Sequence, residues 1–218
     1  TTFSEYTIVS ENKVIKKPKN ISWKFASIFG CAFLTGAGLV LNRLDKIKRD
    51  KIISVYGLGG IGMSMLSMLI SMGFKNVISI DKNRKKLHIA KKIGAKFCID
   101  SNKKDYKKKI RQLFNKDIDI CLEAGGTIKT IQESFDIIND KSGILYFTSH
   151  PNFGKKIYIN PHELIQGKKI FGSWGGYSYP DRDISLILKI IKKEHIKIFD
   201  RIVRLYNFNN IRLAFRDF

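Results

Sequence analysis

The stretch VYGLGGIGMSMLSMLI, residues 55–70, constrains the fold of this chain more than any other. An apolar strand-like segment runs through a cluster of glycines directly into an apolar helix-like segment. Gly57, Gly59 and Gly62 in this cluster match the spacing G-x-G-x-x-G. Such a loop suits phosphate binding when it follows a strand and opens a helix, because the helix N-terminus offers free N–H groups. The stretch therefore predicts a strand–loop–helix unit that can hold a phosphate.

The same alternation of strand and helix continues along the chain after residue 51. Between residues 103 and 114, for example, the apolar residues recur at helical spacing and the lysines fill the other face. Alternation of this kind favours βαβ units, so we predict an α/β fold with a doubly wound parallel sheet. The main strands are expected at residues 52–56, 76–81, 96–100, 118–126 and 143–149. Further strands are expected at residues 3–9, 156–160, 168–176 and 202–205.

Asp81 ends the predicted strand that follows the glycine loop and lies 19 residues after Gly62. An acid about 20 residues beyond the glycines completes a dinucleotide-binding pattern, because its carboxylate can accept hydrogen bonds from ribose hydroxyls. A 2′-phosphate would be repelled there, so the pattern favours NAD(H) over NADP(H). Gly57 would permit the tight turn, Gly59 the approach of a pyrophosphate, and Gly62 close helix packing. The loop residues predicted to bind the cofactor are Gly57, Leu58, Gly59, Gly60, Ile61 and Gly62.

The cysteines are Cys31, Cys98 and Cys121, an odd number with no C-x-x-C pair. This usage argues against a disulfide framework and predicts a reducing compartment, the cytoplasm. Cys98 and Cys121 lie in predicted strands and are expected in the core. On spacing alone, Cys31 would also be a small buried hydrophobic residue.

The formal net charge of +21 indicates either a polyanion partner or a compositional drift toward lysine. Lysines occur along the whole chain and no aromatic residues interleave with them, so we expect no specific nucleic-acid partner. The apolar run at residues 25–41 is at the short limit for a membrane span and is interrupted by three glycines and a threonine. We therefore expect no span, but a helix that breaks at Gly30 and resumes at Phe33.

Several segments together resemble one known family. TTFSEYTIV, GCAFLTGAG, VYGLGGIG, ISIDKNRKKLHIAKKIGA and GSWGG are similar, in order and spacing, to the C-terminal two-thirds of zinc-dependent medium-chain dehydrogenases. The alcohol dehydrogenase and glutathione-dependent formaldehyde dehydrogenase group is the most similar. The resemblance implies a Rossmann domain at residues 33–174, flanked by remnants of a GroES-like catalytic domain at residues 1–32 and 175–218. We therefore expect an incomplete chain.

The resemblance also implies roles for individual residues. Cys31 matches the third protein ligand of a catalytic zinc, whose other ligands would come from an N-terminal region that this chain does not contain. Thr35 matches the residue beside the nicotinamide ring, and Ile61 would press on the other side of that ring. The remaining implied cofactor contacts are Lys86 at the adenosine ribose, and Phe147 and Ser149 near the carboxamide.

The leading hypothesis is an NAD-dependent, zinc-dependent alcohol dehydrogenase that acts on a small alcohol or aldehyde and is at most weakly active as this chain alone. A polyol dehydrogenase or quinone reductase of the same superfamily, and a naturally short non-catalytic dinucleotide-binding module, are the alternatives. The resemblance further implies a homodimer that pairs through residues 155–174.

The four histidines carry less information. His150 is either a polar group on the substrate side or an exposed turn residue. His88, His162 and His195 lie among charged residues, and we expect them to be solvated.

Overall fold

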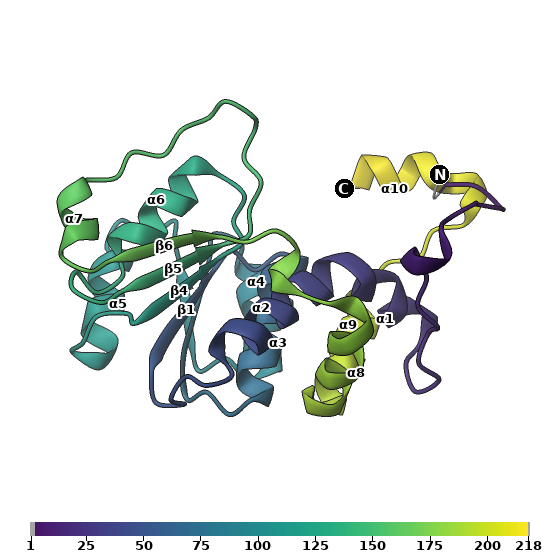
Figure 1. Ribbon diagram of the computed structural model, residues 1–218, viewed down its shortest axis with the longest axis horizontal. Coiled ribbons are helices and arrows are strands. Elements are labelled where there is room, and N and C mark those ends of the chain that lie inside the picture. Colours follow the sequence, from purple (N-terminus) through teal and green to yellow (C-terminus); the bar gives the residue numbers. More distant parts are fainter. Residues whose placement is uncertain (1–2, 218) are drawn as a thin grey trace.

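Six parallel strands form one sheet in the computed structural model, which describes residues 3–217 (Figure 1). The strand order is β3-β2-β1-β4-β5-β6, so the order reverses between β1 and β4. In doubly wound sheets, ligands bind at such a reversal, outside the carboxyl ends of the strands. The strands are β1 Ile52–Tyr56, β2 Asn76–Asp81, β3 Phe97–Asp100, β4 Ile120–Glu123, β5 Ile144–Phe147 and β6 Lys169–Gly172.

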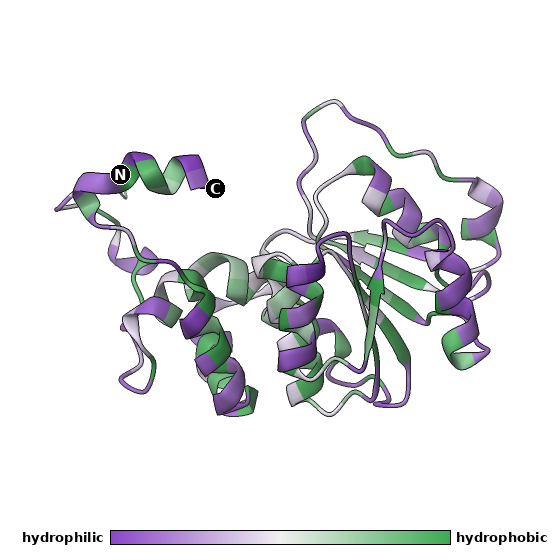
Figure 2. Ribbon diagram, turned by 180° about the vertical axis from the view of Figure 1, so that it is seen from behind, coloured by the Kyte–Doolittle hydropathy of each residue, from purple (hydrophilic) through white to green (hydrophobic). Residues whose placement is uncertain are grey.

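Helices cover both faces of this sheet, which confirms the predicted doubly wound architecture (Figure 1). One face packs against α2 Leu34–Leu44, α3 Gly60–Ser71 and α4 Arg84–Ile93. The other face packs against α5 Tyr106–Phe114 and α6 Ile128–Asp136. Figure 2 shows the hydropathy that goes with this burial: the strands are largely hydrophobic (green), whereas the covering helices have alternating hydrophilic (purple) and hydrophobic (green) residues.

The remaining helices are α1 Trp23–Ile28, α7 Pro161–Ile165, α8 Pro180–Ile190, α9 Lys193–Ile202 and α10 Ile211–Asp217, with short 3-10 turns at Glu11–Lys13, Gly175–Tyr177 (η3) and Phe208–Asn210.

The central strand β1 explains why a nearly continuous apolar run forms here. All of its residues are buried, because successive side chains point to opposite faces and both faces are covered. Ile53 and Val55 join the core on the α3 side, and Ile52 and Tyr56 join the core on the α6 side. A strand buried in this way has the apolar sequence of a central parallel strand rather than an alternating one.

The apolar run near the N-terminus forms one continuous helical segment. The predicted break at Gly30 is wrong, because a π-helical turn, Phe29–Phe33, joins α1 to α2 without interruption. By length and composition Trp23–Leu44 could cross a membrane, yet half of its most apolar window is buried inside the fold. Part of that burial is a close crossing of α2 over α3, where a Cβ at Gly36 would overlap Ser64 Oγ and the Ile61 carbonyl oxygen.

Three of the predicted strands do not form. Residues 3–9 and 156–160 are irregular, and residues 202–205 hold the end of α9 and the connection after it. A strand needs a neighbour for its backbone N–H and C=O groups, and no such neighbour pairs with these segments within residues 3–217. Residues 148–160 instead form the long excursion between β5 and α7 in Figure 1.

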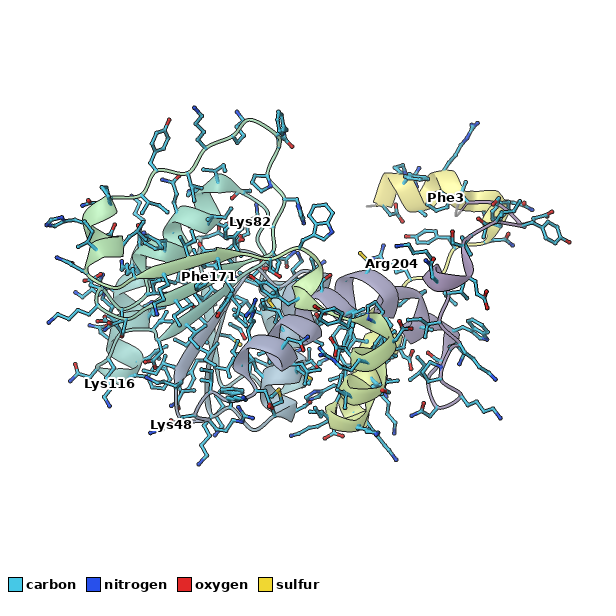
Figure 3. The ribbon with its side chains drawn as sticks, in the orientation of Figure 1. Phe3, Lys48, Lys82, Lys116, Phe171 and Arg204 are labelled. Atoms are coloured by element: carbon cyan, nitrogen blue, oxygen red, sulfur yellow. The ribbon has the colours of Figure 1, made fainter. Side chains whose placement is uncertain are left out.

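The two ends of the described chain lie side by side, away from the sheet (Figure 1). The ring centroids of Phe3 and Phe215 are 5.3 Å apart in an edge-on arrangement, and Figure 3 shows Phe3 beside α10. The sheet therefore stands apart from the terminal segments, and its carboxyl ends carry the candidate site.

Candidate functional site

The glycine loop joins β1 to α3 at the reversal of strand order. Gly57 has a φ of +89°, and a Cβ there would lie 2.6 Å from Gly125 Cα in the loop after β4. A Cβ at Gly62 would overlap the Gly57 carbonyl oxygen. Both positions therefore need glycine because of the protein's own packing. Gly62 thus serves the close helix–strand packing that the sequence predicts.

Gly59 differs from these two glycines. It precedes the first residue of α3 with a negative φ, and a Cβ there would meet no atom within 4 Å. No side chain caps this helix N-terminus, and the first N–H groups of an α-helix have no intrahelical partners. Packing within the described chain does not explain glycine at this position. The open space in front of uncapped N–H groups fits a phosphate that approaches the backbone closely.

Asp81 lies at the carboxyl end of β2, as the sequence predicts, with only 7% of its surface exposed. Its Oδ2 accepts a hydrogen bond from the Leu58 N–H at 2.6 Å, and its Oδ1 accepts one from the Asn83 N–H at 2.7 Å. Sequence reasoning missed these contacts with the backbone. Because an ionised carboxylate can accept about four hydrogen bonds, Asp81 retains capacity for a ribose hydroxyl.

A cavity of about 290 Å³ opens beside the glycine loop. Gly59 and Gly60 line one side, Lys86 of α4 borders it, and Phe199 of α9 contributes to its apolar side. The structure therefore brings Lys86 and the loop together, although they are far apart in the sequence.

Glu123 is a site residue that sequence reasoning missed. Its side chain is fully buried at the carboxyl end of β4, and its Oε1 accepts hydrogen bonds from the N–H groups of Gly125 at 2.7 Å and Gly126 at 3.2 Å. The Thr130 hydroxyl donates to the same oxygen at 2.7 Å, and the Ser149 hydroxyl donates to Oε2. Glu123 therefore ties the loop after β4 to the loop after β5. An acid that ends an apolar strand before a glycine pair is the signal that could have revealed it.

The other residues at this edge follow β5. Phe147 ends the strand, and its ring lies against Gly172 of β6, where a Cβ would be 3.0 Å from Phe147 Cζ. Ser149 is held by Glu123, as described above. His150 is exposed, with its ring centroid 4.7 Å from the Trp174 ring centroid in an edge-on arrangement. Phe147 and Ser149 therefore lie at the carboxyl ends of the strands, on the same edge as the glycine loop.

The residues implied to bind zinc and nicotinamide lie on the segment from α1 to α2. Cys31 is exposed in the π-helical turn, and Thr35 is half-buried one turn later. Within residues 3–217 no three His, Cys, Asp or Glu side chains lie together so that they could hold a metal ion. A catalytic zinc needs three protein ligands, so the described residues do not make a zinc site by themselves.

The other two cysteines are not disulfide-bonded either. Cys121 is fully buried in β4, as expected, and burial raises the pKa of its thiol to about 12. Cys98 is only half-buried in β3, and burial raises the pKa of its thiol as well. Both thiols therefore stay protonated and unreactive at neutral pH.

The expectation that His195 is solvated is wrong. His195 is buried between α9 and α3, with its Nδ1 2.9 Å from Ser67 Oγ and 3.2 Å from Ser71 Oγ. The surrounding charges in the sequence misled the prediction, because they lie on the outer face of α9 whereas the imidazole lies on the inner face. His88 and His162 are exposed, as expected.

Comparisons with known proteins agree with this geometry. Residues 60–193 match the family model described as zinc-binding dehydrogenase. A benzyl alcohol dehydrogenase from Acinetobacter calcoaceticus has a similar structure, with 25% identity and a TM-score of 0.85 over 95% of this chain. An alcohol dehydrogenase zinc-binding domain protein from Burkholderia ambifaria is similar over 95% of the chain, with 27% identity and a TM-score of 0.83.

A third structure shares the fold at 18% identity. It is an alcohol dehydrogenase from E. coli in complex with NADH, similar over 93% of this chain with a TM-score of 0.76. The matches cover 57%, 55% and 57% of the three relatives' own chains, respectively, so this chain spans a little over half of their length.

Proposed function

This chain belongs to the zinc-binding dehydrogenase family of oxidoreductases, and from that premise we propose that it is the NAD-binding part of an alcohol dehydrogenase. In this proposal residues 33–174 bind the cofactor, and residues 1–32 and 175–218 belong to the catalytic domain. The remaining part of the enzyme would lie outside this chain, since the similar structures are longer.

The observation that carries the proposal is the open, uncapped N-terminus of α3 at Gly59. The pyrophosphate would lie there, where the N–H groups and the helix dipole stabilise negative charge. Lys86, which borders the same cavity, would reach the adenosine ribose. When bound, the cofactor supplies the acceptor for a hydride from an alcohol carbon or the donor of a hydride to an aldehyde carbon.

Asp81 supports NAD(H) rather than NADP(H) in this proposal. Its buried carboxylate ends β2 beside Leu58, where a 2′-phosphate would bring a second negative charge close to it. Because two nearby negative charges in a site of low dielectric repel strongly, the phosphorylated cofactor should bind less well.

For zinc, Cys31 is the residue of this chain that we propose as a ligand. Two further ligands would have to come from outside residues 3–217, so we assign no catalytic step to the metal. Thr35, one helical turn from Cys31, is proposed to contact the nicotinamide ring together with Ile61.

The test is an NADH fluorescence titration of the whole 218-residue chain and of Gly59→Val. A Cβ at Gly59 would meet no atom within 4 Å, so the variant should fold normally, whereas the side chain in front of the helix N-terminus should lower NADH affinity at least tenfold. Gly30→Val is the matched control, because a Cβ at Gly30 also meets no atom within 4 Å. The proposal fails if the chain shows no saturable NADH signal, or if Gly59→Val binds NADH as tightly as the parent chain.

A non-catalytic dinucleotide-binding module is the second candidate function, and it would need no metal site. Residues 3–217 contain no group of three metal-binding side chains, which fits both candidates, because the dehydrogenase proposal takes two ligands from outside this range. Zinc analysis of the protein isolated from its natural source separates the two candidates, because a dehydrogenase that uses Cys31 would contain stoichiometric zinc and the module would contain none.

We also propose that the protein forms a homodimer through the exposed edge of β6. Phe171 lies on this strand (Figure 3). It is 42% exposed, and Trp174 just beyond the strand is 84% exposed. An unpaired edge strand with exposed aromatic residues needs cover, and a second copy would continue the sheet. Light scattering of the natural protein and of Phe171→Lys tests this, since the charge should yield monomers.

A further inference from the structure

The positive charge of this chain is concentrated in one segment. Residues 82–109 contain twelve lysine or arginine residues and two aspartates, a formal net charge of +10 out of +21 for the whole chain. About one-eighth of the sequence therefore carries nearly half of the excess charge. Compositional drift toward lysine would spread the excess evenly, so it does not account for this concentration.

The structure folds this segment into a groove at one edge of the sheet. The segment forms α4, the edge strand β3, the connection after it and the start of α5. A groove of about 480 Å³ lies among these elements, and its charged lining consists of Arg84, Lys91, Lys103, Lys109 and Asp100, with His88 beside them. Concave surfaces that carry one sign of charge focus the electrostatic potential and raise the local concentration of oppositely charged ligands.

The acids of the segment neutralise only part of this charge. Asp100 Oδ2 lies 3.0 Å from Arg84 Nε, and Asp105 Oδ2 lies 3.1 Å from Lys109 Nζ. The Arg84 and Lys109 side chains are exposed, although the Asp100 side chain is largely covered, and ion pairs with exposed cations contribute little. Lys91 and Lys103 are exposed and form no ion pair within the part of the chain that the structure describes. The groove is therefore left with uncompensated positive charge.

The spacing of the cations on α4 suits a linear polyanion. The cations Arg84 and Lys91 are seven residues apart, so they lie on one face of the helix, with His88 between them. At about 1.5 Å per residue they span roughly 10 Å. Four successive phosphates along one nucleic-acid strand, about 3.4 Å apart along the axis, also extend over about 10 Å.

The exposed side chains distinguish between the possible polyanions. No large hydrophobic side chain of residues 82–109 is exposed, whereas binding to a membrane surface combines positive charge with apolar insertion. Tyr106, the aromatic residue of the groove, is buried, so it offers no platform on which an unpaired base could stack. The groove thus presents charge alone, and contacts to phosphates carry no sequence information.

We propose that the groove between α4, β3 and α5 binds the phosphate backbone of double-stranded nucleic acid without reading its sequence. This role is separate from the proposed cofactor site, because it depends on a different edge of α4 and needs no NADH. It is also compatible with the expectation from the sequence that the chain has no specific nucleic-acid partner.

The test measures fluorescence anisotropy of labelled DNA and RNA duplexes of about 20 base pairs with the whole chain, as a function of salt. If four cations contact phosphates, affinity should fall about 150-fold between about 50 and 200 mM salt. The variant Lys91→Gln/Lys103→Gln would lose two contacts, so its affinity should fall only about 12-fold over the same range. The preferred duplex identifies whether DNA or RNA is the partner.

The matched control is Lys46→Gln/Lys48→Gln, which removes the same charge from exposed residues between α2 and β1. The proposal predicts that this control keeps the salt dependence of the parent chain. Three results would overturn it: no duplex binding at about 50 mM salt, an equal loss in both double variants, or binding to phosphatidylserine vesicles without binding to duplexes. Circular dichroism of both variants verifies that the fold is intact.

Discussion

The Asp81 carboxylate accepts a hydrogen bond from the backbone N–H of Leu58 at 2.6 Å, so the acid that ends β2 holds the glycine loop in place. A second hydrogen bond, from the Asn83 N–H at 2.7 Å, fixes the orientation of the same carboxylate. The acid and the glycines of the dinucleotide pattern are therefore physically coupled. A change at Asp81 should affect the loop itself as well as any ribose contact.

Asp81→Ala tests this coupling. The variant leaves the buried Leu58 N–H without its acceptor, which should lower the free energy of unfolding by about 1–3 kcal/mol. NADH affinity should fall at least tenfold, because both the loop geometry and the ribose contact are lost. Urea unfolding and an NADH titration measure the two effects. Asp45→Ala, at an exposed position, should change neither, and a fully stable Asp81→Ala would contradict the coupling.

Substitution by alanine should destabilise the protein at Gly62 but not at Gly59. A methyl group at Gly62 would overlap the Gly57 carbonyl oxygen, which is backbone and cannot move away easily. Gly62→Ala should therefore lower the free energy of unfolding by about 1–3 kcal/mol or more. Gly59→Ala meets open space and should leave stability within about 0.5 kcal/mol. Thermal unfolding of both variants checks this contrast, and equal stabilities would contradict the packing described for the loop.

The glycine loop and Asp81 could be predicted because their signals are local in the sequence. The spacing of the glycines after an apolar strand can be recognised within one short segment. The acid at the end of the next strand can be recognised in the same way. The strands predicted at residues 3–9 and 156–160 failed for the opposite reason. A strand exists only with a partner, and their local patterns contain no information about whether a partner lies alongside.

Glu123 and His195 illustrate the same limit at the level of side chains. The hydrogen bond from Ser149 to Glu123 depends on the register of β4 beside β5, in which Glu123 lies opposite Phe147. The burial of His195 depends on how α9 packs on α3. Neither arrangement can be predicted from the spacing of residues along one segment. For Glu123 the sequence does contain a hint, because a charged residue ends an apolar strand. For His195 it contains no such hint.

Glu123→Gln should destabilise the protein although it preserves the shape of the side chain. The carboxylate accepts hydrogen bonds from four donors, and an amide would place its own N–H groups against some of them. Because hydrogen bonds to a charged group contribute about 1.5–3 kcal/mol, the free energy of unfolding should fall by about that amount. Ser149→Ala should cost less, about 1 kcal/mol. Urea unfolding of both single variants and the double variant measures the coupling between them.

If Glu123 and Ser149 act through their mutual hydrogen bond, the double variant should be more stable than the sum of the single effects indicates. Additive effects would show that Glu123 acts through the glycine N–H groups and Thr130 alone. A Glu123→Gln variant as stable as the parent chain would contradict the buried four-donor arrangement.

His195 should make stability depend on pH below neutrality. Burial between α9 and α3 lowers the pKa of this imidazole, and nearby Lys192 lowers it further, whereas Glu194 on the same helix opposes the shift. The unfolded chain, with a histidine pKa near 6.5, therefore binds a proton more readily than the folded chain does. Stability is then fully present above about pH 6.5 and falls as the pH decreases below that value.

His195→Asn removes this titration while an amide can still form a hydrogen bond with Ser67 or Ser71. Urea unfolding between about pH 7.5 and 5 should show a smaller loss of stability for this variant than for the parent chain. His88→Asn, at an exposed histidine of α4, should keep the parent's pH dependence. If His195→Asn and the parent chain lose stability equally toward acid pH, the titrating group lies elsewhere, and the buried imidazole does not control the contact between α9 and α3.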